Sequence, residues 1–310
     1  MTKFYFSYDY GKNILMPLKE EAIIFPYGDS IFPIWHLLYV EERRSDISVL
    51  TSESLLCSWY IELIKKIHPT VSFPFNKIAI KDFKYHNLNE VKKDRLKRTI
   101  FANFGRFPIY VGFTAKKEAE IQKDYLFLPD GVFFRLFSKE SNEELKRELL
   151  KRNLQFVVRG ICDEIIPKDK TVSEIMNSYS AAYSERGNLY RLIDVDMSIA
   201  EYKKALTISP SLLPIQLNLG FAYLNDKDYD KAIEIFKKIA KEFPDYQPSL
   251  VHSGLGLVYQ NKSRIDDAIK EYKIALRLDP NNARAKQMLE AIKEQKNRLT
   301  KIKVLNILAK

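Results

Sequence analysis

The chain has 310 residues, of which 46% are hydrophobic and 29% are charged, so it can bury the cores of roughly two domains. No apolar run reaches the ~18 residues needed to cross a bilayer, and the first residues lack the basic and apolar segments of a signal peptide. The net charge of +10 is compatible with an anionic partner but does not identify one.

The first half alternates short β-forming runs with helical ones. Strands are predicted over 22–25, 47–51 and 107–114, and helices over 30–43, 55–67 and 88–104. Residues 126–137 predict two strands around a Pro-Asp-Gly turn. This order predicts an α/β domain over 8–140, a small, mostly parallel α/β sandwich with a hairpin at one edge of its sheet.

Residues 141–170 are predicted to form a linker helix and a connection, and the pattern is helical from residue 171 onward. Two segments there align: LNLGFAYLNDKDYDKAIEIFKKIAKEFP, from Leu217, and SGLGLVYQNKSRIDDAIKEYKIALRLDP, from Ser253. Small Gly220 allows two helices to approach closely, and large Phe236 fills the adjacent space. A proline ends each second helix because it cannot donate the next helical hydrogen bond.

These spacings resemble the tetratricopeptide repeat, a helix-turn-helix unit of about 34 residues. A degraded earlier copy has a first helix over 177–186 and, after an unusually long loop, a second helix ending near Pro210. We therefore expect an all-α array of about three units plus a capping helix over 171–298, followed by a basic tail over 299–310.

The resemblance implies a peptide-binding groove lined by the first helix of each unit. The matching groove positions are Leu217, Phe221, Leu224, Asn225, Ser253, Leu257, Gln260 and Asn261. The Lys and Asn with which some family members clamp a peptide carboxylate are absent, because Leu217 and Phe221 occupy those positions. The alternative is that this face packs on the protein's own neighbouring helices.

The runs GDSIFPIWHLLYVEERRSDISVL, FPIYVGFT and DYLFLPDGVFFRLF resemble the soluble region of a bacterial multi-pass membrane protein family related to protein O-mannosyltransferases, which are GT-C-like. Tetratricopeptide repeats commonly follow in that family, so the resemblance covers nearly the whole chain. It implies that the chain is the extramembrane part of a glycosyltransferase-like protein. The membrane helices and acidic catalytic loop of that family are absent from it.

Asp29 has two interpretations. As an N-cap it would accept hydrogen bonds from the free N–H groups of the helix that starts near Ile31. As a site residue it would form a ligand loop with Trp35 at the carboxyl end of a strand. No partner of fixed geometry accompanies it, and this loop is a residue shorter than the family's usual form, so the cap is favoured.

No catalytic residue, metal site or cofactor is predicted. The four histidines show no metal-ligand spacing, no glycine-rich phosphate loop follows a strand, and Cys57 and Cys162 are expected to be buried free thiols. We therefore expect this chain to be a non-catalytic module rather than an enzyme.

The expected function is protein or peptide binding through the repeats, and the alternative is a substrate- or glycan-handling domain. The basic segment 92–98 and the C-terminal tail are candidates for contact with an anionic membrane surface, whereas nucleic acid is disfavoured. The resemblance implies a membrane-associated, extracytoplasmic location, and a complete stand-alone chain would be cytoplasmic.

Overall fold

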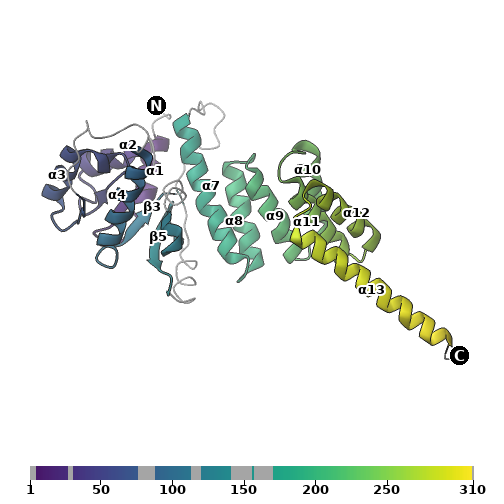
Figure 1. The fold of residues 1–310 in the computed structure, drawn as a ribbon. Coiled ribbons are helices and arrows are strands. Elements are labelled where there is room, and N and C mark those ends of the chain that lie inside the picture. The colour runs from purple at the N-terminus through teal and green to yellow at the C-terminus, as the bar shows by residue number, and fades with distance from the viewer. Residues whose placement is uncertain are drawn as a thin grey trace. The chain divides into compact units, whose positions relative to one another are not determined.

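The computed structural model describes residues 5–26, 31–75, 88–112, 120–140, 156 and 170–308. The chain divides into two compact units, residues 1–186 (unit 1) and 187–310 (unit 2). Helix α7 (Lys170–Tyr190) contributes residues to both (Figure 1). The bounds predicted for the α/β domain, 8–140, and for the repeat array, 171–298, remain predictions.

Unit 1 combines a small sheet with short helices. Its elements are α1 (Tyr5–Leu15), β1 (Ile23–Phe25), α2 (Ile31–Trp35), the π-helix η3 (His36–Val40), β2 (Ser48–Val49), the 3₁₀ turn η4 (Ser54–Leu56), α3 (Ser58–Ile67), α4 (Leu88–Asn103), β3 (Ile109–Val111), the 3₁₀ turn η7 (Glu120–Lys123), β4 (Tyr125–Asp130) and β5 (Phe133–Ser138). Each helix or strand predicted within the described ranges has a counterpart there, and β1, β2 and β3 are shorter than predicted. The single helix predicted over 30–43 is instead a short α-helix followed by a π-helix that ends at Val40.

The sheet of unit 1 has the strand order β2-β1-β3-β5-β4. β1 pairs in parallel with both β2 and β3, so that Ile23 lies opposite Ser48 and Ile109. β5 is antiparallel to β3 and forms a hairpin with the edge strand β4. The predicted edge hairpin is confirmed. The prediction of a mostly parallel sheet is wrong, because the hairpin supplies as many antiparallel pairings as the first three strands supply parallel ones.

One face of this sheet packs against α3 and α4. Ile23, Phe25, Ile109 and Val111 occupy alternate positions along β1 and β3, as the two-residue period of a strand requires. They are buried in one cluster with side chains from α3 and α4, including Tyr60, Ile64, Leu96 and Ile100.

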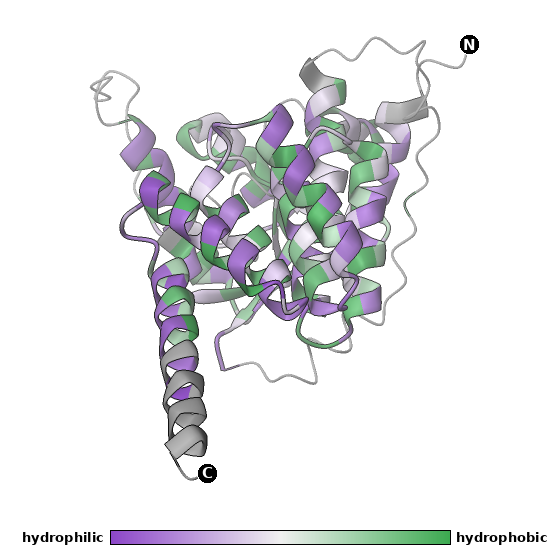
Figure 2. Cartoon of the chain, turned by 90° about the vertical axis from the view of Figure 1, so that its right-hand side faces the viewer, coloured by the Kyte–Doolittle hydropathy of each residue, from purple (hydrophilic) through white to green (hydrophobic). Residues whose placement is uncertain are grey.

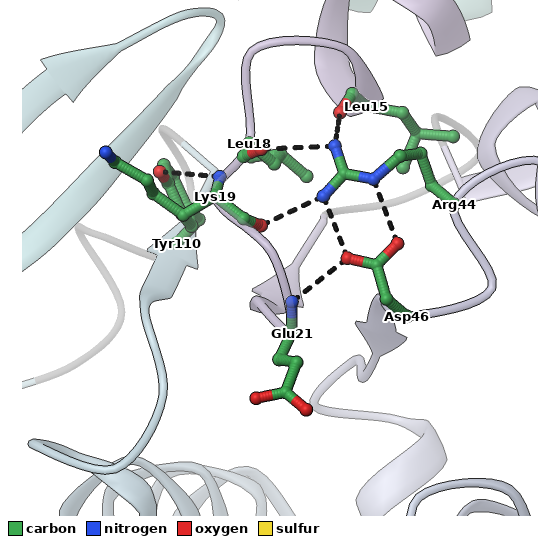
Figure 3. Close-up of polar contacts among 7 residues, drawn as sticks. All are labelled: Leu15, Leu18, Lys19, Glu21, Arg44, Asp46 and Tyr110. Carbon is green, nitrogen blue, oxygen red and sulfur yellow. Dashed lines mark hydrogen bonds and ion pairs between the residues drawn. The ribbon is translucent and has the colours of Figure 1, made fainter.

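Arg44 joins two loops of unit 1 (Figure 3). Its guanidinium donates two hydrogen bonds of 2.9 Å to the carboxylate of Asp46. It also donates to the backbone carbonyl oxygens of Leu15, Leu18 and Lys19, at 2.7, 3.1 and 2.9 Å. Leu15 is the last residue of α1, so one of these bonds satisfies a carbonyl without a partner inside the helix. The guanidinium also holds the pKa of the Asp46 carboxyl below its ordinary value.

Unit 2 is a series of antiparallel helical hairpins. After the end of α7 come α8 (Val195–Ile208), α9 (Leu213–Asn225), α10 (Tyr229–Glu242), α11 (Pro248–Asn261), α12 (Ile265–Leu278) and α13 (Ala283–Leu308). The helices pair as α9–α10 and α11–α12, and α13 packs on the last pair (Figure 1). The end of α7 forms a first hairpin with α8 through Gly187 and Tyr202. Hydrophobic and hydrophilic positions alternate along these helices (Figure 2), as expected for elements with one buried face.

Candidate functional site

The predicted groove depends on how closely the helices of unit 2 pack, and glycines set that distance. A Cβ atom on Gly220 would lie 2.7 Å from the ring of Phe236, and one on Gly256 would lie 2.6 Å from the ring of Tyr272. Both rings are completely buried. Gly254 of α11 also faces the Phe236 ring, where a Cβ would lie 2.9 Å away. Phe236 is therefore packed against the glycines of two successive hairpins.

The first hairpin uses the same packing. A Cβ atom on Gly187 would lie 2.7 Å from the Tyr202 ring. The Tyr202 hydroxyl donates to Asn188 Oδ1 at 2.6 Å, and Ser198 Oγ donates to the Gly187 carbonyl at 2.8 Å. Sequence reasoning ended this first helix at Arg186 and therefore missed Gly187. The Gly-x-x-Tyr spacing of 187–190, which recurs at 220–223 and 256–259, would have identified it.

The eight predicted groove residues differ in exposure. Leu217, Ser253 and Leu257 are buried, with 3%, 1% and 8% of their surface exposed. Phe221, Leu224 and Gln260 are partly exposed, and Asn225 and Asn261 are exposed. A ligand could reach the partly exposed and the exposed residues without any rearrangement of the protein.

Several of the accessible positions also have partners within the protein. The Phe221 ring lies edge-on to Phe236 at 5.0 Å, and the Arg284 guanidinium lies 6.0 Å from it. Gln260 Oε1 accepts a hydrogen bond of 2.7 Å from the Tyr272 hydroxyl. Arg284 is exposed and comes from the first turn of α13, so the capping helix adds a positive charge beside Phe221.

The start of α13 covers part of α11. Asn282 Nδ2 donates to Ser249 Oγ at 2.8 Å and to Ser253 Oγ at 2.9 Å, while its Oδ1 accepts from the N–H of Ala285 at 3.0 Å. At Ser253 the protein's own capping segment therefore occupies the predicted face. At this position the structure agrees with the alternative that the face packs on neighbouring parts of the protein.

Of the predicted ligand loop in unit 1, only Trp35 can be placed, because Asp29 lies outside the described residues. Trp35 is half-buried, and its ring centroid lies 5.9 Å from that of Phe32 and 6.3 Å from that of Tyr60. Tyr60 is buried and donates its hydroxyl hydrogen to the Val49 carbonyl at 2.8 Å. Burial raises the pKa of Tyr60, which favours the protonated hydroxyl that donates this hydrogen bond.

Ion pairs neutralise much of the basic segment on α4. Lys92, Lys97 and Arg98 lie 3.0, 3.6 and 2.9 Å from carboxylate oxygens of Glu53, Asp124 and Asp94, respectively. Arg95 is buried and donates to the Leu55 carbonyl at 2.6 Å. The segment therefore offers less free positive charge than its sequence indicates.

Two histidines have acidic neighbours that sequence spacing did not reveal. His252 Nδ1 lies 2.6 Å from Glu271 Oε2, and His36 Nε2 lies 3.6 Å from Glu41 Oε1. Within the described ranges, no three His, Cys, Asp or Glu side chains form a group that could hold a metal ion. Cys57 is a free thiol but is half-buried rather than buried, and Cys162 lies outside the described residues.

Three family models match parts of the chain. Residues 7–97 match TMEM260-associated domain 2, and residues 194–258 and 249–282 each match a tetratricopeptide repeat model. Residues 194–282 of this chain therefore contain tetratricopeptide repeats. Among the helices that the structure describes, none has a stretch both long and apolar enough to span a membrane.

A curated relative and several solved structures are similar to this chain. The peroxisomal targeting signal receptor of Eremothecium gossypii is 32% identical over 106 residues, which are 34% of this chain but only 17% of the relative. The first TPR of Spaghetti (RPAP3), solved with the HSP90 peptide SRMEEVD, is 23% identical with a TM-score of 0.35, covering 39% of this chain and 95% of that one. The Arabidopsis OM64 TPR domain is 19% identical with a TM-score of 0.35, covering 38% and 98%.

Proposed function

We propose that the repeats of unit 2 bind a peptide segment of a protein partner on the face formed by the first helices of the hairpins. The observation that supports this most directly is the set of accessible side chains on that face. Phe221 and Leu224 offer partly exposed apolar surface, and Asn225 and Asn261 offer exposed amides. The name of the curated relative, a receptor for a targeting signal, also supports a peptide ligand.

The side chains on this face indicate what kind of peptide it would prefer. Leu224 and Phe221 favour an apolar anchor residue, while exposed Arg284 beside Phe221 favours an acidic group near that anchor. Because Leu217 and Ser253 are buried, the ligand would contact the rim rather than the floor of the face.

A random-peptide display library screened against the full chain tests this function. Peptides that are enriched should bind the Leu224→Glu/Arg284→Glu variant at least about tenfold more weakly, because one change removes the apolar contact and the other reverses the charge. Fluorescence polarisation with the synthesised peptides measures the affinity.

Leu278→Glu is the matched control, because Leu278 is 50% exposed and belongs to a second helix of a hairpin, α12. It should bind as the wild type does, and circular dichroism should show all variants to be folded. Equal affinity of the double variant and the wild type would contradict the assignment of the face.

We further infer that the chain is the extramembrane module of a glycosyltransferase-like membrane protein. The match of residues 7–97 to TMEM260-associated domain 2 supports this, since it includes the first of the three runs that carry the sequence resemblance. In this proposal the module is membrane-associated on the extracytoplasmic side, and the basic C-terminal tail contacts anionic headgroups.

A second candidate function is handling of a glycan near Asp29 and Trp35. The grouping of Trp35 with Phe32 and Tyr60 supports it, because aromatic rings stack on sugar rings. Titration with mannose-containing oligosaccharides and nucleotide sugars should then change the tryptophan emission, and the Trp35→Phe variant should lose that change. A flat titration with every sugar would count against the candidate.

A further inference from the structure

Unit 1 exposes several large apolar side chains on α2, η3 and α3. We call this set the aromatic face; its members are Phe32, Tyr39, Val40, Trp59, Leu63 and Ile67. Trp59 and Val40 are the most exposed, at 67% and 69%. Isolated exposed apolar residues are normal, but a group of them marks an interaction surface.

The members of the aromatic face on different helices are connected through rings beneath them. Phe32 touches Trp35, Trp35 touches Tyr60, and Tyr60 lies edge-on to Trp59 at a centroid distance of 5.5 Å. This chain of contacts runs from α2 to α3 without interruption. The exposed rings of the two helices are therefore linked through one packed set of side chains.

The helix α3 extends that surface along its length. Trp59, Leu63 and Ile67 are four residues apart, so they follow one side of the helix. Below them, Tyr60 and Ile64 are buried in the core of unit 1, and the Tyr60 hydroxyl is fixed to the Val49 carbonyl. The face is thus supported by a packed core.

The kinds of side chain indicate the ligand. Trp59 and Tyr39 combine an apolar ring with a polar atom, a combination enriched where lipid headgroups meet acyl chains. The aliphatic side chains of Val40, Leu63 and Ile67 have no hydrogen-bonding groups, so they suit acyl chains better than the hydroxyl groups of a sugar. Apolar surface of this type is what an interfacial segment buries in a bilayer.

The charges beside the α3 end of the face are complementary to anionic headgroups. Lys65 and Lys66 lie in the last turn of α3, and Lys66 is three residues from Leu63 on the same side of the helix. Glu62 lies at ion-pair spacing before Lys66. Near η3, Glu41 is already paired with Arg43 at 2.8 Å. Glu42, the next residue, is exposed and negative. Positive charge therefore remains only at the α3 end, where we expect the anionic headgroups to lie, and salt should weaken binding only modestly.

We propose that the aromatic face docks on the surface of a bilayer containing anionic lipid, with Trp59 and its neighbours inserted at the level of the headgroups. The inference goes beyond peptide binding by the repeats and does not depend on it. It places the contact on unit 1, on different residues from the basic segment of α4 and the C-terminal tail.

Fluorescence of the full chain tests the proposal. Trp35 and Trp59 are the chain's two tryptophans, so the Trp35→Phe variant leaves Trp59 as the single reporter. Added vesicles of equal parts phosphatidylcholine and phosphatidylglycerol should shift its emission to shorter wavelength, and brominated acyl chains should quench it. In flotation, the Trp59→Ser/Leu63→Gln variant should lose at least about tenfold in partitioning.

The control is Leu192→Gln, which removes an exposed leucine from unit 2 and should float with vesicles as the wild type does. Circular dichroism of the double variant checks its fold. If it is unfolded, Val40→Ser/Leu63→Ser replaces it. Unchanged Trp59 emission with vesicles, or equal flotation of the folded face variant and the wild type, would overturn the proposal. A shift of Trp59 emission with protein concentration alone would assign the face to self-association and overturn it too.

Discussion

The Phe236→Ala variant should lower the free energy of unfolding of unit 2 by about 4 kcal/mol. The Phe236 ring is completely buried and fills the space left by Gly220 and Gly254. Its removal leaves a cavity that these glycines, which have no side chains, cannot fill. Because the two glycines come from successive hairpins, the variant should weaken packing both within a repeat and between repeats.

Guanidinium denaturation followed by two probes measures this effect. Both tryptophans lie in unit 1, so their emission reports that unit, while far-UV circular dichroism includes the helices of unit 2. The variant should shift the circular dichroism transition and leave the tryptophan transition in place. Phe243→Ala, at a position 39% exposed, is the control and should cost less than about 1.5 kcal/mol. Equal shifts for the two variants would refute the packing role of Phe236.

The repeat could be predicted from sequence because its packing imposes a fixed spacing. A glycine on one helix must meet a ring on the next, so Gly220 and Phe236 are as far apart as Gly256 and Tyr272. The first hairpin was placed less accurately. Only its second helix was aligned by spacing, and the helix before it was ended four residues too early, at Arg186 instead of Tyr190.

The direction of the strands was harder to predict. Local sequence identifies the hairpin at 125–138, but it does not say which of its strands joins β3. The structure pairs β5 with β3, which makes that junction antiparallel. Strand pairing depends on contacts distant in sequence, whereas the position of a strand depends on its own residues.

The groove could be predicted only as a set of positions. Helical periodicity shows that Ser253 and Leu257 share a side of α11, but it cannot show that Asn282 binds Ser253 or that Leu257 is 8% exposed. The pairing of His252 with Glu271 was missed for the same reason, because the two residues are on different helices, α11 and α12.

The second large effect concerns Arg44, whose replacement by alanine should lower the stability of unit 1 by about 2–3 kcal/mol. The change leaves the carbonyl oxygens of Leu15, Leu18 and Lys19 without their charged donor. Alanine keeps a Cβ atom at a backbone φ of 57°, so the loss reports the side chain rather than relief of backbone strain. Arg44→Lys should restore less than half of the lost stability, since an ammonium group cannot reproduce the planar, bidentate hydrogen bonding of a guanidinium. Tryptophan emission during denaturation measures the stability of unit 1 in the wild type, Arg44→Ala and Arg44→Lys.

Arg43→Ala provides the neighbouring control, because the Arg43 side chain is 52% exposed and its ion pair with Glu41 should contribute less than about 1 kcal/mol. A loss as large as that of Arg44→Ala would show that loop charge, rather than the hydrogen bonds of Arg44, is responsible.

Acid should distinguish the two arginines as well. Arg44 lowers the pKa of Asp46 in the folded protein. The pair therefore makes its full contribution to the stability of unit 1 at pH values above the ordinary aspartate pKa of about 3.9. That contribution is lost as pH falls from there through the lowered pKa. The wild type and Arg43→Ala should therefore lose stability over this range more steeply than Arg44→Ala, in which Asp46 has no guanidinium to lower its pKa. Parallel pH profiles for all three proteins would show that the Arg44–Asp46 pair is not coupled to folding.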